Sequence, residues 1–123
     1  MTIFKALESV DAGSYNTYSQ AQKIAWLSQL DSMIKTQILD AYEPDGEHPA
    51  FSGYDENTEL DTRLLVPEPF DEVYLYWLES RIDYANNEYA RFNNSNAMYA
   101  VALQRFADHY HRTHKPLSSG AFH

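Results

Sequence analysis

The second half of the chain, 69–116, most constrains the fold because it carries two long amphipathic helical patterns. Over 70–92, apolar and aromatic residues recur at steps of three and four, the period of one helix face. The same spacing continues over 98–110, after a polar break at 93–95 in which Ser95 suits a helix N-cap. The sequence therefore predicts a helical hairpin that turns at this break and stops before the last proline.

The first half of the chain predicts two further helices. Residues 2–10 place their apolar side chains on one helical face and end at a turn over 11–14. Ser19 and Gln22 form a capping-box pattern that opens a second helix over about 20–40. Three of the four predicted helices are expected to share one core: Leu27, Leu30, Ile34, Tyr74, Leu78, Ile82, Ala85, Met98, Ala102 and Phe106.

Between the second and third helices, 43–69 is acidic, lacks periodicity and is punctuated by proline and glycine. A connection of this length is commonly functional, disordered or partly structured. Its run 62–66 suits a short strand or extended arm, although Pro67 and Pro69 exclude a central strand. The predicted fold class is therefore all-α: one domain over 1–123, a small four-helix bundle with a long acidic loop and a flexible, extended C-terminal tail over 117–123.

Charge and composition exclude several classes of function. Nine basic against 18 acidic residues give a net charge of −9, which argues against a phosphate-binding surface. The chain has no cysteine, which excludes disulfides and thiolate metal sites. No stretch approaches the roughly 18 apolar residues of a membrane span, and the first ten residues are too polar for an export signal. We expect no membrane association and no export.

The histidines near the C-terminus invite a metal interpretation that their spacing does not favour. His111 and His114 share a helix face while His109 points elsewhere, and His123 lies beyond the helix. Histidines in a last helical turn also interact favourably with the helix dipole. We therefore expect no stoichiometric metal and no cofactor.

Two other chemical patterns are incomplete. Acidic and amide side chains alternate from Asp55 to Asp61 as in a calcium-binding loop, but Leu60 occupies the glycine position and Val66 the closing glutamate position. The chain has no Gly-x-Ser-x-Gly elbow and no glycine-rich phosphate loop. The sequence therefore predicts a protein that is not an enzyme.

Tyrosines are more numerous in the hairpin than one buried stripe can use, so some of them are expected to face outwards. Core packing and an interface with a neighbouring subunit both remain open for these side chains. They are Tyr74, Tyr76, Tyr84, Tyr89, Tyr99 and Tyr110.

Apolar side chains also occur in the long loop and in the tail, which both look too long or too polar to serve the monomer core. Apolar groups on such arms usually need a pocket on a partner. The predicted partner contacts are Phe51, Tyr54, Leu64, Leu65, Val66, Leu117 and Phe122.

Three segments resemble a known family: FSGYD at 51–55, LDTRLLVPEPFDEVY at 60–74 and IDYANNEYARFNNS at 82–95. Over about 19–116 the chain resembles small proteins encoded among the head and neck genes of tailed bacteriophages and prophages. It is similar to the helical head-tail connectors, also called adaptors or head-completion proteins.

This resemblance implies a structural virion protein at the head-tail interface, present in the host cytoplasm during assembly. It implies a homo-oligomeric ring, a dodecamer in this family, that docks on the portal protein and contacts a downstream neck, stopper or tail protein. DNA would pass through the ring without specific binding, since acidic side chains in the lumen repel phosphate.

The alternative from the sequence is an acidic DNA mimic or inhibitor that occupies the basic groove of a nuclease or another nucleic-acid-binding target. Such a protein would array carboxylates along one continuous face at phosphate-like spacing. Here the carboxylates are dispersed, and 43–61 holds the densest set.

Overall fold

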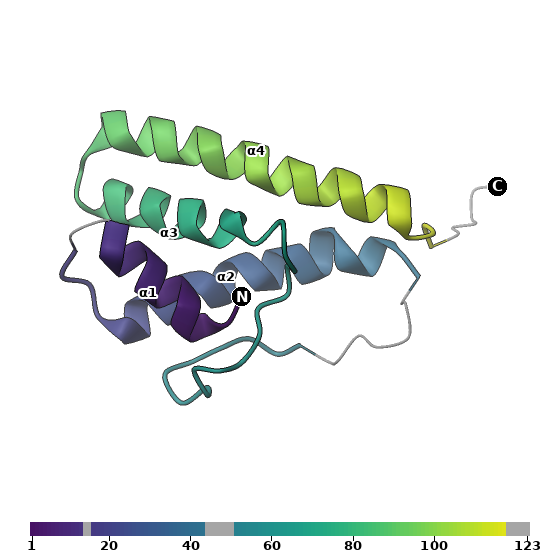
Figure 1. The fold of residues 1–123 in the computed structure, drawn as a ribbon, viewed down its shortest axis with the longest axis horizontal. Helices are drawn as coiled ribbons and strands as arrows, with labels where there is room; N and C mark the ends of the chain where they lie inside the picture. The colour runs from purple at the N-terminus through teal and green to yellow at the C-terminus, as the bar shows by residue number, and fades with distance from the viewer. Residues whose placement is uncertain (14–15, 44–50, 118–123) are drawn as a thin grey trace.

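A computed structural model of the chain describes residues 1–13, 16–43 and 51–117 (Figure 1). Within these ranges the fold is all-α, as predicted, and contains isolated β-bridges but no strand. The elements are α1 (Ile3–Gly13), α2 (Gln20–Gln37), the 3-10 turn η1 (Leu39–Ala41), α3 (Glu72–Ala85) and α4 (Tyr89–Thr113).

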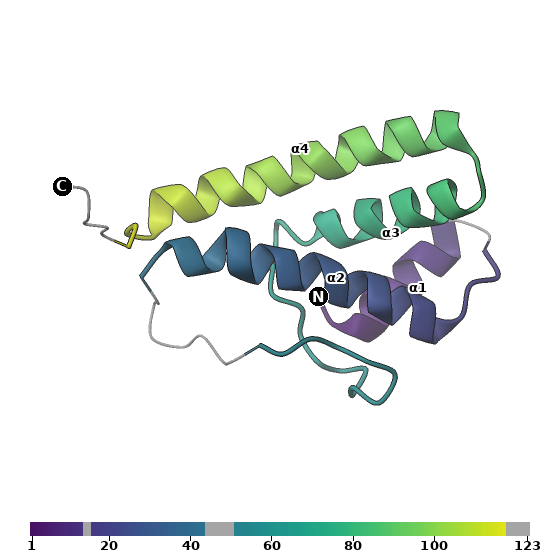
Figure 2. The same cartoon turned by 180° about the vertical axis from the view of Figure 1, so that it is seen from behind.

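The helices form layers with α3 in the middle. α3 contacts α1, α2 and α4, and both views place α4 on the outside, with α1 and α2 on the opposite side of α3 (Figures 1 and 2). Leu78 of α3 is fully buried at the centre. Eight of the ten predicted core residues are buried and so confirmed: Leu27, Leu30, Ile34, Tyr74, Leu78, Ile82, Ala102 and Phe106.

The prediction is wrong for Ala85 and Met98. Ala85 is the last residue of α3 and lies beyond the packed part of the hairpin, where its side chain is exposed. Met98 lies one turn before Ala102, at the edge of the face that packs against α3, and 42% of its surface is exposed. The next two members of the same stripe, Ala102 and Phe106, are buried as predicted.

The first two helices form where the sequence indicates, but α1 continues through 11–13, where a turn was predicted, and α2 ends at Gln37, before the 3-10 turn η1. Ser19 caps α2, since its hydroxyl accepts a hydrogen bond from the backbone N–H of Gln22 at 3.0 Å. Lys23 of α2 is almost fully buried and donates to Asp11 of α1 at 2.7 Å and to Asn16 at 3.0 Å. This paired cation fixes the end of α1 against the start of α2.

The hairpin turns seven residues earlier than predicted. α3 ends at Ala85, Asn87 adopts the left-handed backbone conformation at φ 60°, and α4 begins at Tyr89. Ser95 is therefore not an N-cap but lies inside α4, where its hydroxyl donates to Asp83 of α3 at 2.9 Å. The chain contains two Asn-Asn pairs, and asparagine tolerates the left-handed conformation at either. The first pair makes the turn because this register buries Ser95 beside Asp83.

The end of α4 is fastened to the end of α2. Glu43 N donates to Lys115 O at 2.8 Å, and Leu117 N donates to Ala41 O at 3.1 Å. These bonds place the last described residues of the chain beside η1. None of the described helices is long and apolar enough to cross a lipid bilayer.

Candidate functional site: the anchored acidic loop

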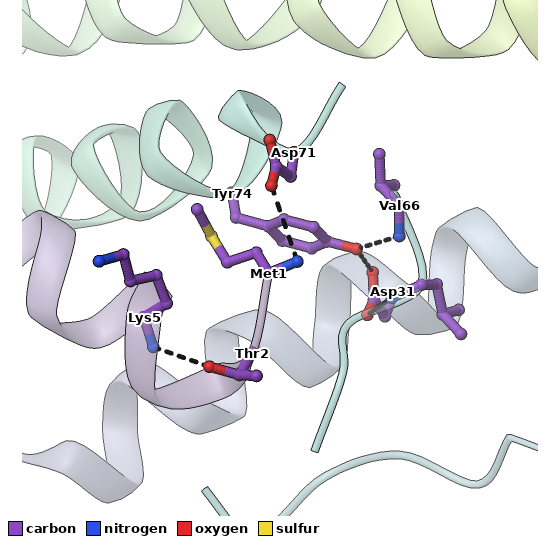
Figure 3. A network of polar contacts seen from close by, with 8 residues as sticks. Met1, Thr2, Lys5, Asp31, Val66, Asp71 and Tyr74 are labelled. Atoms are coloured by element: carbon purple, nitrogen blue, oxygen red, sulfur yellow. Dashed lines mark hydrogen bonds and ion pairs between the residues drawn. The ribbon is translucent and has the colours of Figure 1, made fainter. Parts of the chain in front are cut away.

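The described part of the long loop, 51–71, is attached to the helices through the buried carboxylate of Asp31 on α2. The hydroxyl of Tyr54 and the backbone N–H of Leu65 donate to one oxygen, at 2.6 and 3.0 Å. The hydroxyl of Tyr74 on α3 donates to the other oxygen at 2.7 Å and accepts from Val66 N at 2.7 Å (Figure 3). One side chain thus joins α2, α3 and two points of the loop.

Burial sets the electrostatics of this cluster. It raises the pKa of Asp31 above its ordinary value of 3.8, and the hydrogen bonds from Tyr54 and Tyr74 offset this shift only in part. The pKa of both tyrosines is also raised, mainly by burial and secondly by the adjacent Asp31 carboxylate. Both hydroxyls therefore keep their protons and remain donors. Asp31 is fully buried and accepts three hydrogen bonds from the protein itself, so the cluster holds the loop in place.

The loop then makes a tight turn that displays carboxylates. Asp55 shapes it by accepting from Asn57 N at 2.8 Å, while Asp55 N donates to the hydroxyl of Thr58 at 2.9 Å. Its four acidic side chains are all exposed. We call 55–61 the acidic turn; its carboxylates belong to Asp55, Glu56, Glu59 and Asp61.

After the acidic turn, the chain caps α1. The backbone N–H groups of Ile3 and Phe4, unpaired within the first turn of a helix, donate to Thr62 O at 3.0 Å and Leu60 O at 2.9 Å. Leu64 N donates to Met1 O at 2.9 Å. Of the two forms expected for 62–66, the structure thus shows the extended arm, with a single bridge between Thr2 and Arg63.

This geometry corrects the idea that the loop does not serve the monomer core. Leu64 is 6% exposed and Val66 is fully buried, so both belong to the core. Tyr54 and Leu65 are half-buried against it, and the ring of Phe51 lies 5.0 Å from that of Tyr54. An extended chain can bury alternate side chains, and Asp31 satisfies the backbone of Leu65 that this burial would otherwise leave unpaired.

The two tail residues among the predicted partner contacts differ in what the structure describes. Leu117 is 50% exposed, although its backbone is bonded to Ala41. Phe122 lies outside the described residues. Contact between these residues and a partner therefore stays a prediction.

The histidines near the end of α4 each pack against a different aromatic ring. His111 hydrogen-bonds the hydroxyl of Tyr42 through Nδ1 at 2.9 Å, His109 lies 4.7 Å from the ring of Phe70, and His114 stacks on Tyr110 at 3.6 Å. No group of three potential metal-ligating side chains occurs in 1–13, 16–43 and 51–117. His123 is not among these residues.

The tyrosines of the hairpin divide between core and surface. Tyr74 and Tyr110 are buried, whereas Tyr84 and Tyr89 are each more than half exposed. Near the turn, Arg81 lies over the ring of Trp77 at 4.5 Å, with the rings of Tyr84 and Phe92 within 6 Å. The outward tyrosines therefore form an aromatic end of the hairpin around a cation.

A polar hollow of about 620 Å³ lies between α3, α4 and the end of α1. Two carboxylates line it, those of Glu79 and Asp83. The pKa of Glu79 is raised, mainly by burial and secondly by the neighbouring Asp83. Asp83 already accepts from Ser95, and Arg91 on the rim pairs with Glu88 at 3.2 Å. Two of the charged groups that line the hollow, Asp83 and Arg91, therefore already have partners.

Comparison with known proteins gives no relative: no family model, no curated protein and no solved structure matches the chain. Functional interpretation consequently depends on the residues and their geometry.

The functional residue that the sequence analysis did not identify is Asp31, which has the sequence pattern of an ordinary charged residue on α2. Its position, four residues after Leu27 and three before Ile34, places it on the apolar stripe and was the available signal.

Proposed function

We propose that the chain is a structural subunit of a tailed-phage head-tail connector, a ring that docks on the portal and joins the capsid to the tail. The observation that carries this proposal is the resemblance of 51–55, 60–74 and 82–95 to that family. These segments contain Tyr54 and Tyr74, which hold the loop to Asp31, and the turn of the α3–α4 hairpin. The resemblance thus falls on parts that set the shape of the subunit.

Two further features support a role in assembly. The acidic turn is fixed, yet its four carboxylates are exposed, which suits a contact surface that need not be ordered on binding. The net charge of −9 suits a channel through which DNA passes without adhering. We expect the protein to act as a structural subunit without catalytic activity of its own.

The test is deletion of the gene from the phage or prophage that carries it, followed by electron microscopy of the particles. We expect filled or leaking heads and free tails, and restoration by the full chain supplied in trans. A chain ending at Leu117 should fold normally, as judged by circular dichroism, but fail to restore tail attachment. Normal infectious particles without the gene would refute the proposal.

The acidic turn is also what an inhibitor would present to a basic groove. Recovery of a basic nuclease or other nucleic-acid-binding protein bound to the chain, with tail attachment unaffected by the deletion, would favour that alternative. Loss of binding in Glu56→Lys with Glu59→Lys would then locate the contact.

A further inference from the structure

The outer face of α4 is a second exposed surface, distinct from the acidic turn. α4 packs chiefly against α3, so its far side has no neighbour among the described helices. Val101 is 51% exposed and Met98 42% exposed, and Ala97, one turn before Val101, is exposed as well. We define the outer face of α4 as Ala97, Val101, Arg105, Asp108 and Arg112, which recur at steps of three and four along one side, with Met98 at its edge.

The charge of α4 is opposite to that of the molecule. The helix carries three arginines and one aspartate, and these leave 6 basic against 17 acidic residues in the rest of the chain. Arg105 is 62% exposed and pairs with Glu72 at 3.2 Å, an exposed pair that water screens strongly. Asp108, the single acidic residue of α4, accepts from Gln104 at 2.8 Å. With two arginines against one aspartate, the outer face of α4 is therefore weakly basic and partly apolar on an acidic protein.

The surface that complements this face is on the same chain. The acidic turn presents four exposed carboxylates within seven residues and is held by Asp31 and by its own backbone bonds. Phe4, 53% exposed, is adjacent, because its backbone is bonded to Leu60. The turn thus offers negative charge beside an apolar ring, as the outer face of α4 offers positive charge beside apolar side chains.

The two surfaces lie on opposite sides of the molecule. In both views α4 runs along one side and the loop that carries the acidic turn lies on the other, with α3, α1 and α2 between them (Figures 1 and 2). They cannot meet within one chain. A contact between two such surfaces on different copies is heterologous, and repeated contacts of this kind close into a ring or extend into a filament.

From this arrangement we infer that the outer face of α4 binds the acidic turn of a second copy of the chain, head to tail. The inference rests on the proposed ring and specifies the two surfaces that join its subunits. Charge complementarity sets the orientation, and burial of Met98, Val101 and Phe4 adds the apolar contribution.

Cross-linking tests the contact directly, because the chain has no cysteine of its own. Glu56→Cys combined with Ala97→Cys, treated with a short bis-maleimide over a concentration series, should give a ladder of dimers, trimers and larger species. Each single-cysteine variant should give no cross-linked species, because its cysteine would not face another cysteine across the contact. Dimers from Ala97→Cys alone would indicate a twofold α4 pairing and overturn the inference, as would the absence of a ladder up to the solubility limit.

Charge reversal tests the same contact by another route. Arg105→Glu with Arg112→Glu, or Glu56→Lys with Glu59→Lys, should each weaken self-association by about tenfold or more, because like charges then face each other. Mixing the two variants should restore association, since both contacts in the alternating assembly are again complementary. Glu88→Arg with Arg91→Glu, a double charge reversal of an exposed pair at the hairpin turn, is the matched control and should associate as the wild type does.

These outcomes separate the inference from the proposed function. If cross-linking gives a ladder but deletion of the gene leaves tail attachment intact, the head-to-tail contact is supported and the connector function is refuted. If deletion gives heads without tails, but cross-linking gives no ladder and charge reversal has no effect, the connector function is supported and the head-to-tail contact is refuted.

Discussion

The loop 51–66 and the helix α4 are held to the rest of the molecule in opposite ways. The loop has no regular structure and is held by a few buried polar bonds, centred on the fully buried Asp31. α4 is 25 residues long and is held by one apolar face against α3. Directional bonds fix the position of a segment but depend on single atoms, whereas apolar packing is distributed and leaves the other face of the helix available.

Truncation of the shared apolar core should have the largest effect. Leu78→Ala removes a fully buried side chain at the middle of α3 and should lower the free energy of unfolding by about 2–5 kcal/mol. Val101→Ala on the outer face of α4 is the matched control and should change it by less than about 0.5 kcal/mol. Denaturant titration monitored by circular dichroism measures both. Equal effects would mean that α4 is packed on both sides.

The next effect concerns the polar anchor. Asp31→Asn keeps the shape of the side chain but leaves at least one of the donors from Tyr54, Tyr74 and Leu65 without an acceptor. The expected loss is about 1–3 kcal/mol. Amide hydrogen exchange should increase first in 51–66 and not in α4, which distinguishes loss of the anchor from general destabilisation. Tyr54→Phe deletes only the hydrogen bond from Tyr54 to Asp31, so it should lower the free energy of unfolding by less than Asp31→Asn does. Uniform exchange in both regions would contradict separate anchoring.

A smaller effect is expected where the loop passes closest to α2. Gly53 has φ 101°, and a Cβ at this position would lie 3.0 Å from the hydroxyl oxygen of Ser28, the group that accepts from Tyr54 N at 2.9 Å. Gly53→Ala should therefore destabilise by about 1–2 kcal/mol. Gly13→Ala, where a Cβ meets nothing within 4 Å, is the control and should be close to neutral. Thermal melts of the two variants measure the difference.

The smallest effect is a dependence on pH. Because burial raises the pKa of Asp31 in the folded state, the unfolded chain releases this proton first as pH rises above 3.8. The contribution of Asp31 to stability is thus fully present below that pH and is lost as pH rises through the folded pKa. The slope is at most about 1.4 kcal/mol per pH unit. The free energy of unfolding is measured against pH for the wild type and for Asp31→Asn, and the difference between the two curves removes the contributions of Asp11 and Glu79. A slope of opposite sign in this difference would show that the Asp31 carboxylate is preferentially ionised in the folded state.

The sequence by itself determined the four helices, the Ser19 cap and most of the core. It could do so because helical periodicity and capping are local properties of the chain. It also located the irregular acidic segment and the end of α4 before Pro116. Only the tertiary structure decided which Asn-Asn pair turns the hairpin and that Leu64 and Val66 belong to the core. Both depend on a partner distant in sequence: Asp83 for Ser95, and Asp31 for the loop.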